Sequence, residues 1–354
     1  MRRSDRLTGV VMKAFGESLP PTQFTNEDVA RWHGRRDADW IHEKIGNRFR
    51  NTLFDFRSNQ LCTDLDEDDL AYEASQRALK TGALSIEDID AILFATISPT
   101  HNVFPDSACT LHRRLDAPPN TAAITLTTGC AGTLNAMMLA SSMVQCGQAR
   151  NVLVCSTSAM SAYIRPDLKD AMWLYGSIFG DGASAIVVGS DTSAEGSHKE
   201  TRGFSSFFTG ANPDKDVAEM RFGGTKRPLH SGNVVEALAG FVNFNFRAVP
   251  GNLKTGFTQL YGQSGTRDEK EHEQPDWVLF NMSNARVQEE WLREQGIGAD
   301  RSYFNQERVG NCGAASLGLV LGEFVEERKP APGQLALLLS VGTGLQYAGV
   351  FYRF

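Results

Sequence analysis

A pattern that occurs twice along the chain constrains the fold more than any other feature. In the first half, an apolar run at 122–127 leads through Gly129-Cys130-Ala131-Gly132 into a small and apolar stretch at 133–144. In the second half, Gly310-Asn311-Cys312-Gly313 opens a similar stretch at 314–321. Helices that are small or apolar on nearly every side are buried. The pattern therefore predicts two buried helices, each entered through a turn that contains glycine.

Each predicted helix is followed by a strand, a glycine turn and another strand. The first half closes with strands at 151–155 and 183–188 and the turn Phe179-Gly180-Asp181-Gly182, and the second with strands at 335–339 and 348–352 and the turn Gly342-Thr343-Gly344. This self-similarity favours an internal duplication, and a chance resemblance between two α/β stretches is the alternative. We expect an α/β protein whose halves are residues 1–190 and 191–354. In the irregular segment between the repeated patterns, a helix is predicted at 234–247.

Composition excludes several classes of protein. Of the 354 residues, 41% are hydrophobic and 22% are charged, which is ordinary for a soluble globular chain. The formal charge of -7 gives no global basic field, so no nucleic-acid partner is expected. No stretch has the roughly 18 apolar residues of a membrane-spanning helix. The first residues have no apolar run typical of a signal peptide, so a cytoplasmic location is expected.

The cysteines point to chemistry rather than to metal binding. The six cysteines are spread through the chain and form neither a CxxC pair nor a ladder with histidine, so no metal site is predicted. Cys130 differs from the others because it stands at a predicted helix start. Such a position offers unpaired N–H groups and partial positive charge, which stabilise a thiolate that can attack acyl groups. A small core cysteine is the alternative interpretation.

The motif around Cys130 resembles a known family. Thr128-Gly129-Cys130-Ala131-Gly132 looks like the nucleophile motif of the ketoacyl synthase III branch of the thiolase-like superfamily. Further matching segments are Asp39-Trp40-Ile41 with Gly46 and Arg48, Thr100-His101 with Phe104-Pro105, Phe179-Gly180-Asp181-Gly182-Ala183, the stretch from Gly310 to Ser316, Pro332-Gly333-Gln334 and Gly342-Thr343-Gly344. The resemblance covers almost the whole chain. It implies a thiolase-like fold, with duplicated βαβαβ halves in five layers (α-β-α-β-α).

The resemblance also implies a reaction. In the family, an acyl group moves from coenzyme A or a carrier protein onto the cysteine, and a malonyl thioester then loses carbon dioxide and attacks it. Carried over to this chain, Cys130 is the nucleophile and Asn311 donates a hydrogen bond to the thioester oxygen on which enolate charge develops. The N–H groups of Cys130 and Thr343 would form the oxyanion hole.

The chain departs from the family pattern at one catalytic position. The family motif His-Gln-Ala-Asn-x-Arg corresponds to Asn281-Met282-Ser283-Asn284-Ala285-Arg286, so Asn281 replaces the catalytic histidine. An amide donates hydrogen bonds but takes up no proton. Asn281 is therefore predicted to assist Asn311 as a donor and not to act as a base. His230 is a candidate substitute base in a segment that resembles the one near the substrate tunnel, and a solvated loop histidine is the alternative.

The resemblance also implies how the acyl group is delivered. No tightly bound cofactor is expected, because the acyl group arrives on the phosphopantetheine of coenzyme A or of an acyl carrier protein. Trp40 is predicted to stack on adenine or to serve as a partly buried anchor, while Lys44 and Arg48 meet phosphates. Asn284 and Arg286 match family positions near the coenzyme, and Arg286 matches one implicated in carrier docking.

Three functions are compatible with these features. The first is decarboxylative condensation, in specialised fatty-acid or polyketide-type biosynthesis. The second is transfer of the acyl group from Cys130 to a hydroxyl or amine, with His230 or the substrate as base. The third is a partner subunit that does not condense. The family is homodimeric, and Phe104 resembles the residue that reaches into the acyl pocket of the other subunit. Acyl chain length, acceptor and type of donor stay open.

Overall fold

The computed structural model describes most of the chain. It covers residues 9–354, except 63, 102–103, 192–201, 206, 213–217, 221–226, 229–231, 233–241, 246, 265–273 and 343–345. The predicted oxyanion-hole residue Thr343 and the candidate base His230 lie outside the described residues.

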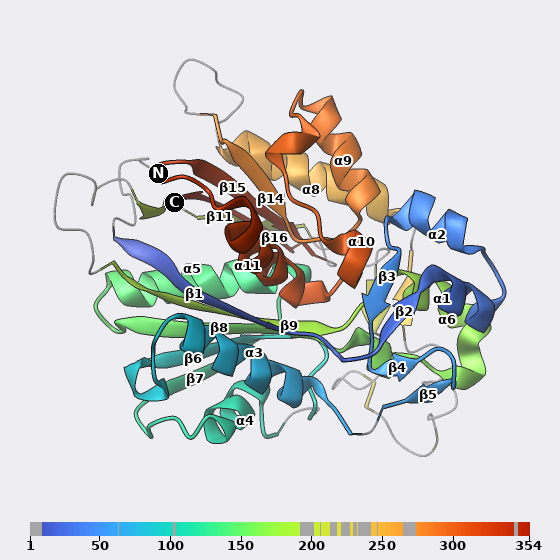
Figure 1. The fold of residues 1–354 in the computed structure, drawn as a ribbon, viewed down its shortest axis with the longest axis horizontal. Coiled ribbons are helices and arrows are strands. Elements are labelled where there is room, and N and C mark those ends of the chain that lie inside the picture. The colour runs from blue at the N-terminus through green and yellow to red at the C-terminus, as the bar shows by residue number, and fades with distance from the viewer. Residues whose placement is uncertain are drawn as a thin grey trace.

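Two β-sheets form the scaffold (Figure 1). The first has the order β1 (Val10–Ser18), β9 (Gly182–Ser190), β8 (Asn151–Ser158), β6 (Ala91–Ala95) and β7 (Ala122–Leu126). The second has the order β10 (Gly203–Phe204), β16 (Gln346–Arg353), β15 (Leu335–Val341) and β14 (Trp277–Phe280), and β11 (Phe208–Ala211) also pairs with β16.

The pairing pattern repeats between the sheets. Strand β8 is parallel to β6 and antiparallel to β9, and β15 is likewise parallel to β14 and antiparallel to β16. Strand β9 then pairs antiparallel with β1, as β16 does with β10 and β11. The two sheets therefore share a topology, as expected of a duplicated fold.

Helices complete five layers, which confirms the predicted fold class. Helices α3 (Glu67–Thr81) and α4 (Ser107–Arg114) cover the outer face of the first sheet, and α8 (Val249–Ser264) and α9 (Ala285–Glu294) cover that of the second (Figure 1). Helices α5 (Gly132–Gln145) and α11 (Ser316–Arg328) lie between the sheets. One buried cluster contains Leu134 and Met137 of α5 together with Leu317 and Val320 of α11. Apolar residues occur around these helices because both contact a sheet on each side.

A smaller group of elements lies beside the layered body, at the right of Figure 1. It contains β2 (Gln23–Thr25), α1 (Asn26–His33), α2 (Ala38–Ile45), β3 (Phe49–Asn51), β4 (Phe54–Asp55), β5 (Gln60–Leu61) and α6 (Lys169–Ile178). Its core is aromatic, since Trp32 packs edge-on against Phe54 and Phe56. The Asp37 side chain caps the start of α2 by accepting a hydrogen bond from the Trp40 N–H, and α2 ends at Gly46 in the left-handed conformation.

The other elements are short. They are β12 (Ala218–Met220), β13 (Val242–Phe244), α10 (Gln306–Val309) and the 3₁₀ turns Ile86–Asp88, Gly129–Ala131, Met160–Tyr163, Pro166–Leu168, Ala299–Arg301 and Gly313–Ala315. The helix predicted at 234–247 is wrong at Val242–Phe244, which pair as a strand with β12. The prediction failed because aromatic residues suit a strand as well as a buried helix.

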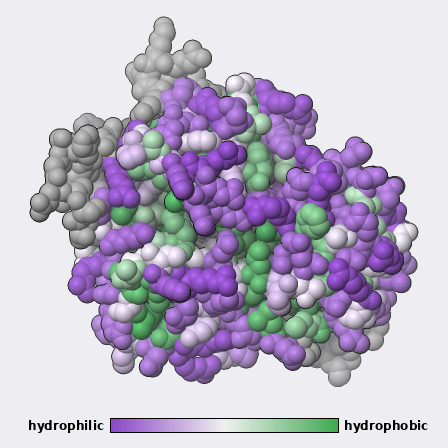
Figure 2. Space-filling model, in the orientation of Figure 1, coloured by the Kyte–Doolittle hydropathy of each residue, from purple (hydrophilic) through white to green (hydrophobic). Residues whose placement is uncertain are grey.

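Polar side chains cover most of the face seen in Figure 2, and apolar side chains gather near β7 at its lower left. None of the described helices is long and apolar enough to cross a membrane.

Along the chain, the last strand of the first sheet ends at Ser190, and the first strand of the second sheet begins at Gly203. The division into 1–190 and 191–354 stays a proposal, because α11 of the second half also packs against β1 and β9 of the first.

Candidate active site

The two turns that precede the central helices meet between the sheets. The turns Gly129–Ala131 and Gly313–Ala315 lead into α5 and α11, and each begins with a glycine of positive φ, 57° at Gly129 and 47° at Gly313. The Thr133 hydroxyl at the start of α5 donates a hydrogen bond of 2.6 Å to the Ala314 carbonyl oxygen. This hydrogen bond joins the starts of the two central helices.

Cys130 lies at this junction and lines a cavity. It is 8% exposed, and Ser340 and Gly342 of the second half lie against its backbone. The Ser340 hydroxyl donates a hydrogen bond of 2.7 Å to the Cys130 carbonyl oxygen. Gly342 packs against the Cys130 amide so closely that a Cβ there would lie 2.9 Å from the amide nitrogen. The position of the nucleophile thus depends on the strand β15 and on the absence of a side chain at 342.

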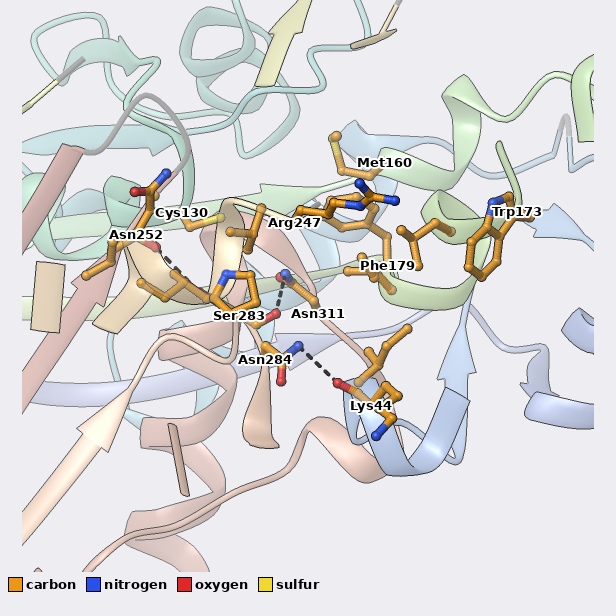
Figure 3. Close-up of a pocket in the computed structure, with 18 of the residues that line it drawn as sticks. Lys44, Cys130, Met160, Trp173, Phe179, Arg247, Asn252, Ser283, Asn284 and Asn311 are labelled. Carbon is orange, nitrogen blue, oxygen red and sulfur yellow. Dashed lines mark hydrogen bonds between the residues drawn. The ribbon is translucent and has the colours of Figure 1, made fainter. Parts of the chain in front are cut away.

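The cavity has a volume of about 590 Å³, and its lining extends from Cys130 to Lys44 of α2 and Trp173 of α6 (Figure 3). Its lining is Arg36, Trp40, Lys44, Ile45, Ile97, Cys130, Met160, Trp173, Leu174, Ile178, Phe179, Arg247, Val249, Pro250, Asn252, Leu253, Ser283, Asn284, Asn311, Val341 and Gly342. Most of these side chains are apolar, the charged ones are all cations, and no histidine, aspartate or glutamate occurs among the described lining residues. The described wall therefore offers a thiol, a hydroxyl, amides and cations, but no general base of these types.

Asn311 presents its amide to the cavity in a fixed orientation. Its Oδ1 accepts a hydrogen bond of 2.9 Å from the Gly313 N–H, and its Nδ2 donates one of 3.2 Å to the Ser283 carbonyl oxygen, drawn in Figure 3. These two bonds determine which amide atom is the nitrogen. The second N–H of Asn311 has no acceptor among the described residues, so it is available to a substrate oxygen.

Asn281 does not take the position that the sequence predicted. Its side chain is fully buried and is not part of the cavity lining. In the orientation that satisfies its amide, Nδ2 donates hydrogen bonds of 2.9 Å to the Gly313 carbonyl oxygen and 3.2 Å to the Cys130 carbonyl oxygen. Both N–H groups are thus used inside the protein. The predicted donation from Asn281 to a substrate is corrected accordingly: the short side chain ends at the backbone of the two helix starts and links them.

Only some of the residues predicted to contact coenzyme A line the cavity. Trp40, Lys44 and Asn284 line the cavity, whereas Arg48 and Arg286 do not. The Asn284 side chain accepts a hydrogen bond of 3.2 Å from the Val287 N–H, which caps α9, and donates a long one of 3.4 Å to the Lys44 carbonyl oxygen. Asn284 therefore connects the cavity wall to α2.

Arg48 and Arg286 are joined by a residue that sequence reasoning missed. Their Nη2 atoms lie 3.2 Å and 3.1 Å from Nε2 of His42. A guanidinium carries only N–H donors, so Nε2 would be the acceptor in both contacts. Arg48 also forms an ion pair with Glu307, and Arg286 forms one of 3.0 Å with Glu289. No motif signals this cluster, because its members come from α2, the bend before β3, α9 and α10.

Phe104 is 86% exposed and is not part of the cavity lining of its own chain.

Two buried carboxylates also lie outside the lining. Burial raises the pKa of Asp181 to about 6 despite hydrogen bonds from the Leu53 and Ser161 N–H groups. Burial raises the pKa of Glu67 to about 7, although three hydroxyls donate to it. Among the described residues, no cluster of histidine, cysteine, aspartate and glutamate could hold a metal ion.

A cysteine at the start of a central helix, within a duplicated five-layer fold, defines the thiolase-like class of enzymes that carry acyl groups on a thiol. Residues 124–205 match the sequence model of 3-oxoacyl-[acyl-carrier-protein (ACP)] synthase III, and residues 266–354 match that of its C-terminal part. The chain is 30% identical over 339 residues to the β-ketoacyl-[acyl-carrier-protein] synthase III of Oceanobacillus iheyensis, and the match covers 96% of both chains. The chain therefore belongs to the 3-oxoacyl-acyl-carrier-protein synthase III family.

Two further relatives agree. The β-ketoacyl-[acyl-carrier-protein] synthase III of Rhodopirellula baltica is 27% identical over 359 residues, with 98% of this chain and 99% of that one covered. The solved structure of β-ketoacyl-[acyl carrier protein] synthase III from Thermus thermophilus superimposes with a TM-score of 0.78 at 26% identity, and covers 97% of this chain and 99% of its own.

Proposed function

We propose that the chain catalyses decarboxylative Claisen condensation between an acyl group on Cys130 and a malonyl-type thioester. One observation carries the proposal. The cavity brings the thiol of Cys130 and the fixed amide of Asn311 together, with no histidine, aspartate or glutamate among the described lining residues. A carbanion formed by loss of carbon dioxide needs hydrogen-bond donors and no base.

The reaction has two stages. In the first, the Cys130 sulfur attacks the carbonyl carbon of the donor thioester, and the donor thiol leaves with the proton of the Cys130 thiol. In the second, the malonyl thioester loses carbon dioxide, and the electron pair of the broken C–C bond forms an enolate whose oxygen accepts from Asn311. The enolate carbon attacks the Cys130 thioester, the Cys130 thiolate leaves, and a β-ketoacyl thioester is released. The N–H groups of Cys130 and Thr343 are proposed to hold the oxyanion.

Transfer of the acyl group to a hydroxyl or amine fits this cavity less well. An incoming alcohol must lose a proton, and a positioned base normally accepts it. The described lining residues include no such base. Transfer is therefore kept as an outcome of the experiment below, as is the role of a partner subunit that does not condense.

We also propose an acyl donor and a homodimeric assembly for this chain. Acyl groups arrive on coenzyme A or on an acyl carrier protein, without a tightly bound cofactor, in the cytoplasm and in a specialised fatty-acid or polyketide-type pathway. A homodimer is proposed through β7, an edge strand of the first sheet that contains the exposed Ile124. Phe104 would then reach the acyl pocket of the other subunit. Ile124→Lys should convert dimer to monomer in light scattering, and a wild-type monomer would contradict the assembly.

Intact-protein mass spectrometry tests the reaction. The protein and Cys130→Ala are mixed with acetyl, hexanoyl and dodecanoyl thioesters of coenzyme A and of a carrier protein, and then with a malonyl thioester. We expect a mass gain that the variant lacks, followed by release of a β-ketoacyl thioester and carbon dioxide. An ester or amide formed from an added alcohol or amine, without carbon dioxide, would favour transfer. No acylation of Cys130 by any donor would overturn both enzymatic functions.

A further inference from the structure

The end of helix α6 lies against the turn that carries Asn311. The backbone of Asn311 pairs with that of Phe179 as a short parallel bridge, and both residues line the cavity (Figure 3). The Asn311 N–H donates a hydrogen bond of 3.1 Å to the Ile178 carbonyl oxygen, and the Asn311 carbonyl oxygen accepts one of 3.0 Å from the Gly180 N–H. The backbone position of Asn311 therefore depends on where α6 ends.

Helix α6 ends on the side chain of a buried asparagine. The last carbonyl groups of a helix have no partner inside it. Nδ2 of Asn47 donates hydrogen bonds of 3.0 Å to the Ser177 carbonyl oxygen and 2.9 Å to the Ile178 carbonyl oxygen. A carbonyl oxygen has two lone pairs, so that of Ile178 accepts from Asn47 and from the Asn311 N–H at once. Asn47 and Asn311 are thus linked through a single oxygen atom.

The amide of Asn47 is held in this orientation by its own neighbours. Asn47 is fully buried, and its Oδ1 accepts a hydrogen bond of 2.9 Å from Nε2 of the buried Gln306, which also donates one of 3.1 Å to the Ile45 carbonyl oxygen. The Asn47 carbonyl oxygen accepts one of 2.7 Å from Nδ2 of Asn26. The side-chain oxygen and the side-chain nitrogen of Asn47 both have partners inside the protein. This side chain is therefore engaged away from any substrate, and it can act only through the groups that it contacts.

The nucleophile is held by other contacts. The Cys130 carbonyl oxygen accepts hydrogen bonds from the Ser340 hydroxyl and from the Asn281 amide. Ser340 belongs to β15 and Asn281 directly follows β14, and neither is among the hydrogen-bond partners of Asn47. A displacement of the end of α6 should therefore move Asn311 more than it moves Cys130.

We propose that Asn47 is a positioning residue for condensation, which places the amide of Asn311 through the carbonyl oxygen of Ile178. The inference rests on the proposed function, because it concerns the donor to the enolate oxygen. Without the Asn47 amide, the last carbonyl groups of α6 would turn toward other donors, and the Ile178 oxygen would no longer be fixed for the Asn311 N–H. The body of α6 would stay in place, since Trp173 on this helix also contacts Trp40 of α2, with ring centroids 5.5 Å apart.

Separate measurement of the two reaction stages tests the inference. Acylation of Cys130 by a saturating hexanoyl thioester, and consumption of the acyl-enzyme by a saturating malonyl thioester, are followed by rapid-quench mass spectrometry. In Asn47→Ala we expect acylation within about twofold of the wild-type rate and condensation slower by about 10- to 100-fold, the cost of a small misplacement of a catalytic group. A loss in acylation as large as that in condensation, or no loss in condensation, would overturn the inference. A wild-type protein that forms no β-ketoacyl product would instead remove the proposed function.

The Asn311→Ala background separates positioning from a general structural role. If Asn47 acts through the Asn311 amide, Asn47→Ala should slow condensation in the wild-type protein but by less than about twofold further in Asn311→Ala, because coupled residues are not additive. The same further loss in both backgrounds would show that Asn47 supports the fold and not the position of Asn311, which would overturn the inference.

Asn151→Ala is the matched control. Asn151 is also a buried amide: its Nδ2 donates a hydrogen bond of 3.0 Å to the Asp88 carbonyl oxygen, and its Oδ1 accepts one of 2.7 Å from Lys13. It stands at the start of β8 and is not part of the cavity lining, so both stages should keep their wild-type rates. If Asn47→Ala does not fold, Gln306→Met replaces it, because this change removes the group that orients the Asn47 amide and should also slow condensation selectively. Condensation at the wild-type rate in Gln306→Met would then overturn the inference.

Discussion

The side-chain amide of Asn281 donates a hydrogen bond of 3.2 Å to the carbonyl oxygen of Cys130. Asn281 directly follows β14 in the second half of the chain, and through this bond it contacts the turn that carries the nucleophile. Because its other N–H reaches the Gly313 carbonyl oxygen, the same amide joins the starts of α5 and α11. A residue at the position of a family catalytic group has become part of the scaffold of the site.

Replacing Asn281 should therefore reduce stability. Asn281→Ala removes two buried hydrogen bonds of about 0.5–1.5 kcal/mol each, while both carbonyl oxygens keep another donor, the Ser340 hydroxyl and the Ser316 N–H. Asn281→Asp should cost more, because its carboxylate would face two carbonyl oxygens. Urea unfolding measures both effects. A normal free energy of unfolding for Asn281→Ala, together with a lower kcat, would instead indicate that the amide contacts the substrate.

Asn311 should be needed for condensation but not for acylation of Cys130. Its available N–H is predicted to bind the enolate oxygen, which forms only in the second stage. Loss of one such donor lowers rates by about 10²–10³ in comparable oxyanion sites. Rapid-quench mass spectrometry of Asn311→Ala should show a normal acyl-enzyme that is consumed slowly by the malonyl thioester. Condensation at the wild-type rate would remove Asn311 from the mechanism.

Gly342 should tolerate no side chain. A Cβ at this position would lie 2.9 Å from the Cys130 nitrogen and 3.2 Å from the Ala131 nitrogen, so Gly342→Ala must displace the nucleophile turn. We expect acylation of Cys130 to fall by about 10² or more, as for loss of an oxyanion donor.

Gly262→Ala is the matched control for this substitution. A Cβ at Gly262, in α8, would meet no atom within 4 Å. This variant should keep its activity and be as stable as the wild type or slightly more stable. Equal acylation rates for the two variants would show that the turn adapts to a methyl group.

The positions of Cys130 and Asn311 could be predicted because local signals determine them. Glycines of positive φ and a small, apolar helix define each turn, and these features are visible within a short stretch of sequence. The repeated order of strands similarly predicted β8 and β9 of the first sheet and β15 and β16 of the second. The central helices had to be apolar on all sides because each contacts two sheets.

The contacts of Asn281, Trp173 and His42 could not be predicted in the same way. Asn281 bonds to carbonyl groups of two turns that are distant in the chain, and any residue type supplies a carbonyl group. Trp173 and His42 depend on how α6, α2 and α9 pack together. Residue identity showed which groups were able to bind a substrate, but only the packing showed which of them were already engaged.

Glu67 should make the stability of the protein depend on pH. It is fully enclosed, and the Thr157 and Ser98 hydroxyls donate hydrogen bonds of 2.6 Å and 2.9 Å to its Oε1. Burial raises the pKa of the Glu67 carboxyl in the folded protein to about 7, from 4.5. Between pH 4.5 and 7, Glu67 is ionised in the unfolded chain but still protonated in the folded protein. Its contribution to stability is therefore fully present below pH 4.5 and is lost as the pH rises through 7.

Glu67→Gln isolates this effect, because glutamine keeps the oxygen that accepts from the hydroxyls and carries no charge. At 1.36 kcal/mol per pH unit, the interval from 4.5 to about 7 corresponds to about 3 kcal/mol as an upper limit. We expect the variant to equal the wild type near pH 5 and to be the more stable protein at pH 8 in urea unfolding. Asp181 titrates in both proteins, so its contribution cancels in the comparison. Parallel stability curves for the two proteins would show that Glu67 is already ionised in the folded state throughout this range.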